Sequence, residues 1–369
     1  MSGQAGVTIG VEEEFLLVDR ESLRSAEAAA SVLKRAADIG LGDGCRLQRE
    51  LWDSEVETNT GVRTDLAGLR GDLIRNRLAL ARAADAEGLD LVSVGHPLFD
   101  TRQAELNADD HYQALRQVCA GVVADQEICG CHVHTGIGDR DTGVAVLNHV
   151  APWLPTLLAI TANSPYRRGR DTGFHSWRMM VYHCLPASGL PPWFASAAEY
   201  DADLARLKEC ALLPPDHGGL RLARLSDHLP TVEVRIGDAA ATVDEAVLYA
   251  ALARGLVRTA LTELDAGREA RRLSDVVLAD ALWAAARHGL CGAAIDPWTG
   301  ARVPASTLAA RLLQHVTPAL TTSGDLDEVR SLLDRVLTGG GAATRQRRAA
   351  AEHGLPGALE MLVRETVAT

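Results

Sequence analysis

An α+β fold with a mostly antiparallel sheet is the class that this sequence predicts, on two observations. Strand-like stretches do not alternate regularly with helical ones, as they would in a doubly wound parallel sheet. From about residue 270 onward, the pattern is typical of helices only. The 369 residues are expected to form a single domain, with a sheet-rich part over 1–240 and a helical part over 241–369.

Short runs of apolar and β-branched residues, several with polar residues at alternate positions, predict the strands. They lie at 8–18, 54–58, 90–95, 128–137 and 230–237. Apolar residues at helical spacing predict helices at 64–87, 243–265, 275–288, 305–316, 325–337 and 342–365. The Gly- and Pro-rich stretch 163–195 is predicted to be an irregular functional loop, because it is too long for a simple connector.

The composition predicts a globular chain that does not bind polyanions. Hydrophobic residues make up 47% of it, and we find no apolar run near 18 residues, so no membrane span is expected. A formal net charge of −12 argues against nucleic-acid and anionic-membrane binding. The start lacks a signal-peptide pattern and the seven cysteines are scattered, so we expect reduced thiols and a cytoplasmic location. Lys34 and Lys208, the two lysines, lie outside glycine-rich contexts, so arginine or metal must neutralise any bound phosphate.

Four of the predicted strands each place two ionisable residues at positions i and i+2. Side chains at this spacing share one face of a strand, whereas on a helix they diverge. The pairs are Glu12 and Glu14, Glu55 and Glu57, His132 and His134, and Glu233 and Arg235. Apolar residues such as Val56, Val133 and Val234 occupy the alternate positions. The sequence therefore predicts a sheet with one polar face and one core face.

Each pair alone has an ordinary explanation, such as a solvated edge strand or a hydrogen-bonded core histidine. Together they predict a face with at least five carboxylates, where like charges ~4 Å apart would repel by about 4 kcal/mol at an effective dielectric near 20. Divalent cations relieve such repulsion, and oxygen-rich sites select Mg²⁺ or Mn²⁺, often together with phosphate oxygens. A zinc site at "CGCHVH" is disfavoured, because no second Cys/His pair follows at finger spacing.

The stretch "SPYRRGRDTGFHSWR", residues 164–178, concentrates arginines among glycines in an acidic chain. Guanidinium groups bind carboxylate and phosphate oxygens two at a time. We expect Arg178, which follows Trp177, to line a site, whereas Arg167 and the arginines beside it fit a solvated loop equally well. A later cluster is predicted to be a solvated helix face and consists of Arg345, Arg347 and Arg348.

The chain carries, in this order, the motifs "TIGVEEEFLLVD", "VETNTG", "CHVHTGI", "ANSPYRRGRDTGFHSWR" and "PTVEVRIGDAAATV". Together they resemble the ATP-dependent carboxylate–amine ligase family, also called glutamate–cysteine ligase type 2. The later "HGLCGAAIDPWTGARVPA" and "AATRQRR" fit as well, so the resemblance covers nearly the whole chain. It implies a glutamine synthetase-like fold, in which a curved antiparallel sheet forms a funnel walled by helices. Mg²⁺ and ATP would lie at one end of the funnel and the amino-acid substrate at the other.

The resemblance also implies roles for the paired residues. Its metal ligands would be Glu12, Glu14, Glu57, His132 and Glu233. Arg235 would contact the transferring phosphate, with Glu233 beside the nucleotide, and Arg178 would bind a substrate carboxylate. The remaining substrate contacts are expected from Trp177, Arg167, Glu55 and His134.

The implied reaction is ATP-dependent amide formation through an acyl phosphate, in which a carboxylate, first of all glutamate, joins cysteine or another amine. Weak activity on the glutamate–cysteine pair is allowed for. The expected partners are small amino acids or amines, and a homodimer stays open. The chain departs from the family pattern at Glu55, where relatives usually have Gln, and at Gly237, where they often have Cys.

Two other classes of function stay open. A metal-dependent hydrolase would use His132, His134 and the glutamates to activate water, and it predicts hydrolysis without ATP. A catalytically inactive relative would act as a binding protein. Measurable ATPase or ligase activity distinguishes both classes from a ligase.

Overall fold

The computed structural model describes residues 5–99 and 106–368, and its main sheet has seven strands there. Their order is β2-β3-β1-β5-β9-β8, and β4 also pairs with β1. Every pairing is antiparallel, and the sheet is open, which confirms the predicted fold class. The strands are β1 (Ile9–Asp19), β2 (Arg46–Arg49), β3 (Glu55–Asn59), β4 (Leu89–Val92), β5 (Gly130–Gly136), β8 (Ala223–Leu225) and β9 (Thr231–Asp238).

Strand β1 is central, and its register decides which residues meet. Glu12 lies opposite Asn59 on β3 and His132 on β5, while Glu14 lies opposite Glu57. Cross-strand partners point to the same face of a sheet, so these side chains share one face. The alternate residues, which include Val11, Phe15, Val56, Val133 and Val234, are at most 1% exposed. The predicted division into a polar face and a core face is therefore present.

Helices α2 (Leu66–Asp85) and α8 (Val243–Asp265) pack against the sheet. Helix α8 begins with a capping box, in which Thr242 and Glu245 satisfy each other's backbone N–H groups. The other helices are α1 (Ala29–Ile39), α3 (Asp110–Cys119), α4 (Arg140–Val150), α5 (Leu154–Thr161), α6 (Trp177–Tyr182), α7 (Ala197–Glu209), α9 (Asp275–His288), α10 (Ala305–Ser323), α11 (Leu326–Gly339) and α12 (Ala342–Thr366). Short 3₁₀ helices lie at Ala120–Asp125, Ala151–Trp153 and Gly289–Cys291.

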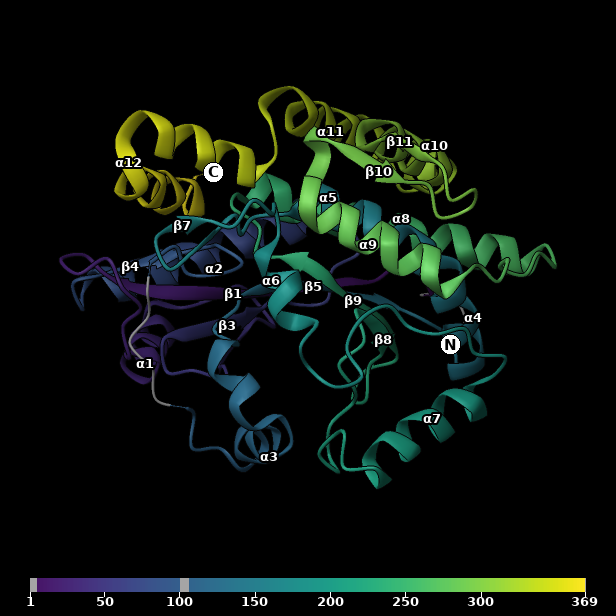
Figure 1. Cartoon of the computed structure of the whole chain (residues 1–369), viewed down its shortest axis with the longest axis horizontal. Helices are drawn as coiled ribbons and strands as arrows, with labels where there is room; N and C mark the ends of the chain where they lie inside the picture. The colour runs from purple at the N-terminus through teal and green to yellow at the C-terminus, as the bar shows by residue number, and fades with distance from the viewer. Residues whose placement is uncertain (1–4, 100–105, 369) are drawn as a thin grey trace.

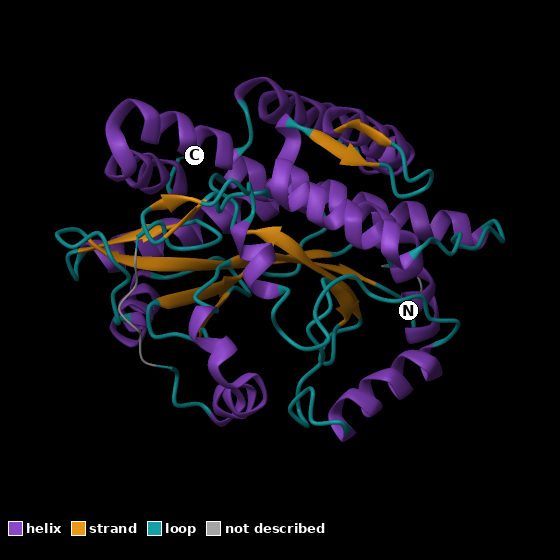
Figure 2. Cartoon of the chain, viewed as in Figure 1, coloured by secondary structure: helices purple, strands orange, loops and turns teal. Residues whose placement is uncertain are grey.

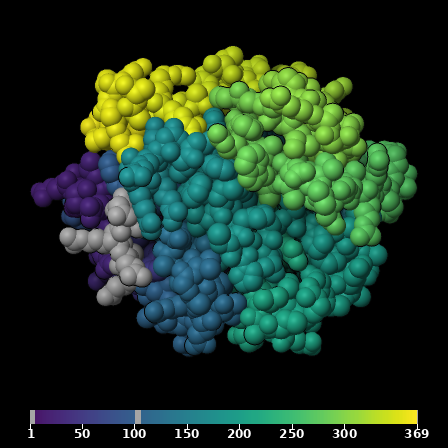
Figure 3. All heavy atoms as spheres, viewed as in Figure 1, coloured from purple at the N-terminus to yellow at the C-terminus, as the bar shows by residue number. Residues whose placement is uncertain are grey.

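The helical C-terminal part and the helices α3 and α7 lie on different sides of the sheet in the view of Figure 1. Helices α9 to α12 gather above it, whereas α3 and α7 stand apart below it. Figure 2 shows the strands as a middle layer beneath that helical group. In the space-filling view, the α3 and α7 regions form two lobes at the lower edge (Figure 3).

Two predictions about local structure are wrong. The C-terminal part contains a hairpin of β10 (Ala293–Ile295) and β11 (Arg302–Pro304), because the Asp296 turn between them closes a backbone hydrogen bond that no helix could make. The stretch 163–195 is not irregular throughout. It forms the hairpin β6 (Tyr166–Arg167) and β7 (Arg170–Asp171), and α6 then starts at its N-cap, Ser176.

The expectation that no apolar run approaches 18 residues also needs correction. Arg140–Thr161 is long and apolar enough for a membrane span by composition, but 89% of its most apolar window is buried in this fold. It forms α4 and α5 in the core. All seven cysteines are free of disulfide bonds, which agrees with the expectation of reduced thiols.

Candidate active site

A first group of candidate metal ligands comes from three neighbouring strands. Glu12 (β1), His134 (β5) and Glu233 (β9) each place one ligand atom within 4.8 Å of the other two. His134 Nε2 lies 3.1 Å from Glu12 Oε1, and its Nδ1 lies 2.9 Å from Thr231 Oγ1, which fixes the ring. Burial alone would raise the pKa of Glu12, but hydrogen bonds with His132 and His134 lower it below its usual range. Glu12 is therefore ionised and able to bind a cation.

A second group consists of carboxylates alone. Glu14 (β1), Glu57 (β3) and Glu50, which follows β2, also place ligand atoms within 4.8 Å of one another. Burial and the charge of Glu14 raise the pKa of Glu50 to about 8. Burial and the charges of Glu12 and Glu50 raise the pKa of Glu57 well above its usual range. In the absence of a cation, Glu50 and Glu57 therefore hold protons that a divalent ion would displace.

His132 lies between the two groups. Its Nδ1 is 3.3 Å from Glu12 Oε2, and its Nε2 is 3.5 Å from Glu14 Oε1. Burial and the charge of Arg235 lower the pKa of His132, so the ring is neutral. Nε2 has no hydrogen-bond partner among residues 5–99 and 106–368. The prediction named His132 as the nitrogen ligand. The three-residue group with Glu12 and Glu233 contains His134, and His132, whose ring lies near both groups, stays a predicted ligand.

Two arginines flank Glu233 at the other side of the face. Arg224 on β8 donates from Nε to Glu233 at 2.7 Å, and Arg235 on β9 also bonds Glu233. Burial opposes ionisation of Glu233, but the charges of Arg235 and Arg224 hold its pKa well below its usual range. The register between β5 and β9 shifts between Cys131 and Val133, beside His132, and Arg235 Nη1 lies 3.5 Å from His132 Nδ1. The predicted proximity of Arg235 and Glu233 to the histidines is therefore present.

Glu55 lies on the same face but in a different environment. It is 2% exposed, and its Oε1 is 3.9 Å from the Cys129 thiol. Burial and the charges of Glu127 and Glu14 raise its pKa well above the usual range. Glu55 is thus neutral near pH 7, and its carboxyl has no charge with which to attract a cationic substrate.

The predicted residues of the arginine-rich stretch divide into two sets. Arg178 is 2% exposed, and its Nη2 lies next to Gly130, where an added Cβ would also meet His132. Arg167 pairs with Asp125 at 2.6 Å, and its guanidinium lies over the Trp177 ring at 5.6 Å. Arg178 therefore borders the polar face, whereas no described contact joins Arg167 to the carboxylates.

Sequence reasoning missed Glu50 and Arg224. Glu50 follows the strand β2, "RLQR", whose largely exposed residues give no hydrophobic alternation. Arg224 lies in a strand of only three residues, which is too short for a periodic signal. The departure at Gly237 has a steric counterpart, because a Cβ there would lie 2.9 Å from the Tyr249 ring. Tyr249 fills the space that a larger side chain would need.

The donor set fits hard divalent cations. Five carboxylates and one imidazole form the two groups, and such oxygen-rich sets suit Mg²⁺ or Mn²⁺ rather than zinc. The protons held by Glu50 and Glu57, and the unpaired Nε2 of His132, mark places where a positive ion or a polar ligand would improve the local electrostatics. Arg224 and Arg235 at the border can contact anions that such ions attract.

Comparisons with known proteins match nearly the whole chain and point to the same family. The sequence profile of glutamate-cysteine ligase family 2 matches residues 8–365. A protein of Saccharopolyspora erythraea, provisionally named glutamate–cysteine ligase 2-2, is 46% identical over 98% of this chain and 93% of its own length. A protein of Salinispora arenicola, provisionally named glutamate–cysteine ligase 2, is 42% identical over 93% of this chain and 90% of its own.

Two solved structures share the fold at low sequence identity. The glutamate–cysteine ligase of Francisella tularensis in complex with AMP superposes with a TM-score of 0.69 at 14% identity, over 98% of this chain and 89% of that one. The ligase PafA, in complex with the prokaryotic ubiquitin-like protein Pup, gives a TM-score of 0.56 at 15% identity, over 99% of this chain and 73% of that one. Both likenesses concern the arrangement of sheet and helices.

Proposed function

The chain belongs to glutamate-cysteine ligase family 2, whose members are carboxylate–amine ligases. We propose that it uses ATP to join a carboxylate to cysteine or another amine, with glutamate as the first candidate for the carboxylate. The observation that carries this proposal is the polar face of the sheet. Two groups of candidate metal ligands and two arginines meet there, and they suit a metal-bound triphosphate. The AMP bound to the Francisella ligase, which shares this fold, lends support to nucleotide binding.

The chemistry follows from the poor reactivity of a carboxylate towards amines. Transfer of the γ-phosphoryl group to a carboxylate oxygen breaks the bond to ADP and gives an acyl phosphate. The amine then attacks the carbonyl carbon, phosphate leaves, and the amine loses a proton as the amide forms. Bound Mg²⁺ would neutralise phosphate oxygens as charge shifts in the loose transition state.

The residues of the chain bind and position the reactants. Glu12, His134 and Glu233 would hold one ion, and Glu14, Glu50 and Glu57 a second. Arg235 would stabilise the transferring phosphoryl group, because its guanidinium already lies beside His132 and Glu233. Arg178 would bind the substrate carboxylate from its place next to Gly130.

The neutral state of Glu55 changes one part of the expected specificity. A charged carboxylate near the acceptor would favour cationic amines, but a protonated one offers a hydrogen-bond donor and acceptor, as Gln does in the usual family pattern. We therefore infer that Glu55 does not select for a positively charged partner.

The test is phosphate release that requires both substrates. The protein is incubated with Mg-ATP, glutamate and a panel of amines, and products are identified by mass. Glu57→Gln and Glu233→Gln should abolish amine-dependent turnover, whereas Glu209→Gln, at an exposed position on α7, should not. Turnover at the wild-type rate in the first two variants would refute the proposal. Hydrolysis that proceeds without ATP would instead indicate the hydrolase.

A further inference from the structure

The segment Arg345–Arg347 at the start of α12 is not the solvated helix face that its charges predict. Arg345 forms ion pairs with Glu245 and with Glu365, each at 2.8 Å. Arg347 pairs with Asp171 of β7 at 2.7 Å, and α12 and β7 are neighbours in Figure 1. Gln346 between them is fully buried. Arg348 is exposed, as the prediction of a solvated helix face requires.

Gln346 fixes one other side chain, that of Asn163. Its Nε2 donates to Asn163 Oδ1 at 2.7 Å and to the Asn163 carbonyl at 3.1 Å. The amide nitrogen of Asn163 donates to the carbonyls of Ser93 and Ala239 at 3.0 and 2.7 Å. All polar groups of the Asn163 side chain are therefore bonded, and its amide has one orientation.

Asn163 in turn holds Asp238, a fully buried carboxylate at the end of β9. The Asn163 backbone N–H donates to Asp238 Oδ2 at 2.8 Å. Ser164 and Ser176 donate their hydroxyls to the same carboxylate at 2.7 and 2.8 Å. Gly95 allows this close packing, because a Cβ there would lie 2.7 Å from the Asp238 carboxyl carbon.

Asp238 positions both ends of Arg178. The Ser164 hydroxyl accepts the Arg178 backbone N–H at 3.0 Å, and Ser176 caps α6 by accepting the Met179 N–H at 3.2 Å. At the other end of the side chain, Arg178 Nη1 lies 3.9 Å from Asp238 Oδ1.

The head group of Arg178 has few bonds of its own. Its guanidinium reaches the carbonyls of Ile236 and Arg235 only at 3.4 and 3.5 Å. Its Nε has no partner in the described part of the chain. A buried guanidinium with this much unused donor capacity depends on its surroundings for orientation, and it can still bind a carboxylate.

We propose that Gln346 is a positioning residue for the substrate carboxylate, acting on Arg178 through Asn163 and Asp238. This inference rests on the proposed role of Arg178 as the group that binds the substrate carboxylate. It gives the C-terminal helix a part in substrate binding, although the side-chain hydrogen bonds of Gln346 within residues 5–99 and 106–368 reach Asn163 and none of the predicted site residues.

The test compares Michaelis constants in two variants of Gln346. Gln346→Met removes the hydrogen bonds at similar length, and Gln346→Glu keeps the shape but replaces the amide donor by a carboxylate. We expect each to raise KM for the carboxylate substrate about tenfold, the effect of one buried hydrogen bond, with KM for ATP unchanged. Arg348→Gln on the same helix is the matched control and should change neither constant.

A double-mutant cycle with Arg178→Lys separates positioning from general stability. If Gln346 acts through Arg178, Gln346→Met should add little to the KM of the Arg178→Lys protein. A lower unfolding temperature without a selective change in KM would show that Gln346 is only structural and would overturn the inference. The proposed role of Arg178 fails separately, if Arg178→Lys leaves KM for the carboxylate unchanged. Wild-type protein without ATP-dependent turnover would overturn the proposed function, and this inference with it.

Discussion

Glu13 and Arg77 form a buried ion pair on the face of β1 that is opposite to Glu12 and Glu14. Glu13 Oε1 lies 2.5 Å from Arg77 Nη2, and their side chains are 2% and 0% exposed. Arg77 also donates to the carbonyl of Thr366 at 3.0 Å, which ties the sheet to the end of the last helix. Of three consecutive glutamates, the outer two therefore belong to the site and the middle one to the core.

Replacement of Glu13 should destabilise the fold. In Glu13→Gln, the Arg77 guanidinium would remain buried without a counter-charge, which typically costs about 3–5 kcal/mol. Urea unfolding should show this loss, while the folded fraction keeps its KM for ATP. Glu21→Gln, at an exposed turn position, is the control and should unfold as the wild type does. An unchanged unfolding free energy in Glu13→Gln would contradict the structural role.

Replacement of Glu57 should have the opposite effect on stability. Because the folded chain raises the pKa of Glu57 well above that of the unfolded chain, its burial costs stability at every pH above the unfolded value of 4.5. Glu57→Gln removes this cost, so we expect about 1–3 kcal/mol of added stability at pH 7.5 in EDTA and little change at pH 4. The same variant should lose turnover. If the wild type and Glu57→Gln had equal unfolding free energies at both pH values, burial and the neighbouring carboxylates would not raise the pKa of Glu57 in the folded chain.

Binding of Mg²⁺ should release protons. Burial and the charge of Glu14 raise the pKa of Glu50 to about 8, and the pKa of Glu57 is also raised, so both carboxyls hold protons near pH 7 and must release up to about two to bind a cation. Calorimetric titrations in two buffers of different ionisation enthalpy measure this number. The ion should also stabilise the wild-type fold, by about 2.7 kcal/mol at a hundred times its Kd, and should stabilise Glu57→Gln less. Binding of Mg²⁺ without proton release would show that the ion does not bind at the second group.

Glu55→Gln should leave both activity and fold nearly unchanged. The buried carboxyl of Glu55 is already neutral, and Gln has the same shape and a hydrogen-bond donor. We expect turnover within about threefold of the wild type, which corresponds to less than about 0.7 kcal/mol. The comparison with Glu57→Gln, two residues away on the same strand, is decisive. A loss of activity in both variants would mean that Glu55 acts as an anion.

The polar face was predictable because strand periodicity depends only on local sequence. Spacing of i and i+2 placed Glu12 with Glu14 and His132 with His134 on one face before any contact was known. The sequence could not predict which of the two histidines lies closest to both Glu12 and Glu233. That choice depends on the orientation of the rings and on the hydrogen bond between His134 and Thr231. Thr231 orients the His134 ring only because the fold brings these two residues together.

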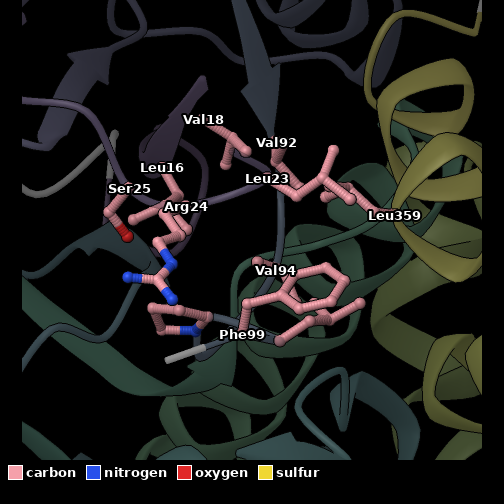
Figure 4. Close-up of a pocket in the computed structure, with 11 residues that line it drawn as sticks. Leu16, Val18, Leu23, Arg24, Ser25, Val92, Val94, Phe99 and Leu359 are labelled. Atoms are coloured by element: carbon pink, nitrogen blue, oxygen red, sulfur yellow. The ribbon is translucent and has the colours of Figure 1, made fainter. Parts of the chain in front are cut away.

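The corrections share a cause in long-range packing. Gln346 and Asn163 are 183 residues apart, and only the docking of α12 brings them together. Three arginines around Gln346 predict a solvated helix face when their own helix is considered alone. Their partners, such as Asp171 and Glu245, are distant in the sequence and give no local signal. A small apolar cavity, in which Leu16, Val92 and Leu359 contribute to the lining, likewise forms between distant elements (Figure 4).

His217 should make the fold sensitive to acid. Burial, then the charges of Arg224 and His111, lower its pKa to about 3, and its ring stacks on His111 at 5.3 Å. Arg235 and Lys208 also face it with positive charge. The unfolded chain takes up a proton on this histidine near pH 6.5, whereas the folded chain does not. Stability is therefore complete above pH 6.5 and falls as the pH decreases towards 3.

The slope of unfolding free energy against pH tests this effect directly. Below pH 6.5, His217 alone should contribute up to about 1.4 kcal/mol of lost stability per pH unit. His217→Asn keeps an acceptor for the Gly219 N–H, which the histidine Nδ1 accepts at 2.9 Å, but it cannot take up a proton. Urea unfolding between pH 6.5 and 4.5 should therefore give a shallower slope in this variant, and the wild-type slope in His228→Asn, at an exposed turn. If His217→Asn lost stability as steeply as the wild type, the acid sensitivity would have to come from other buried histidines such as His96, whose pKa burial lowers to about 4.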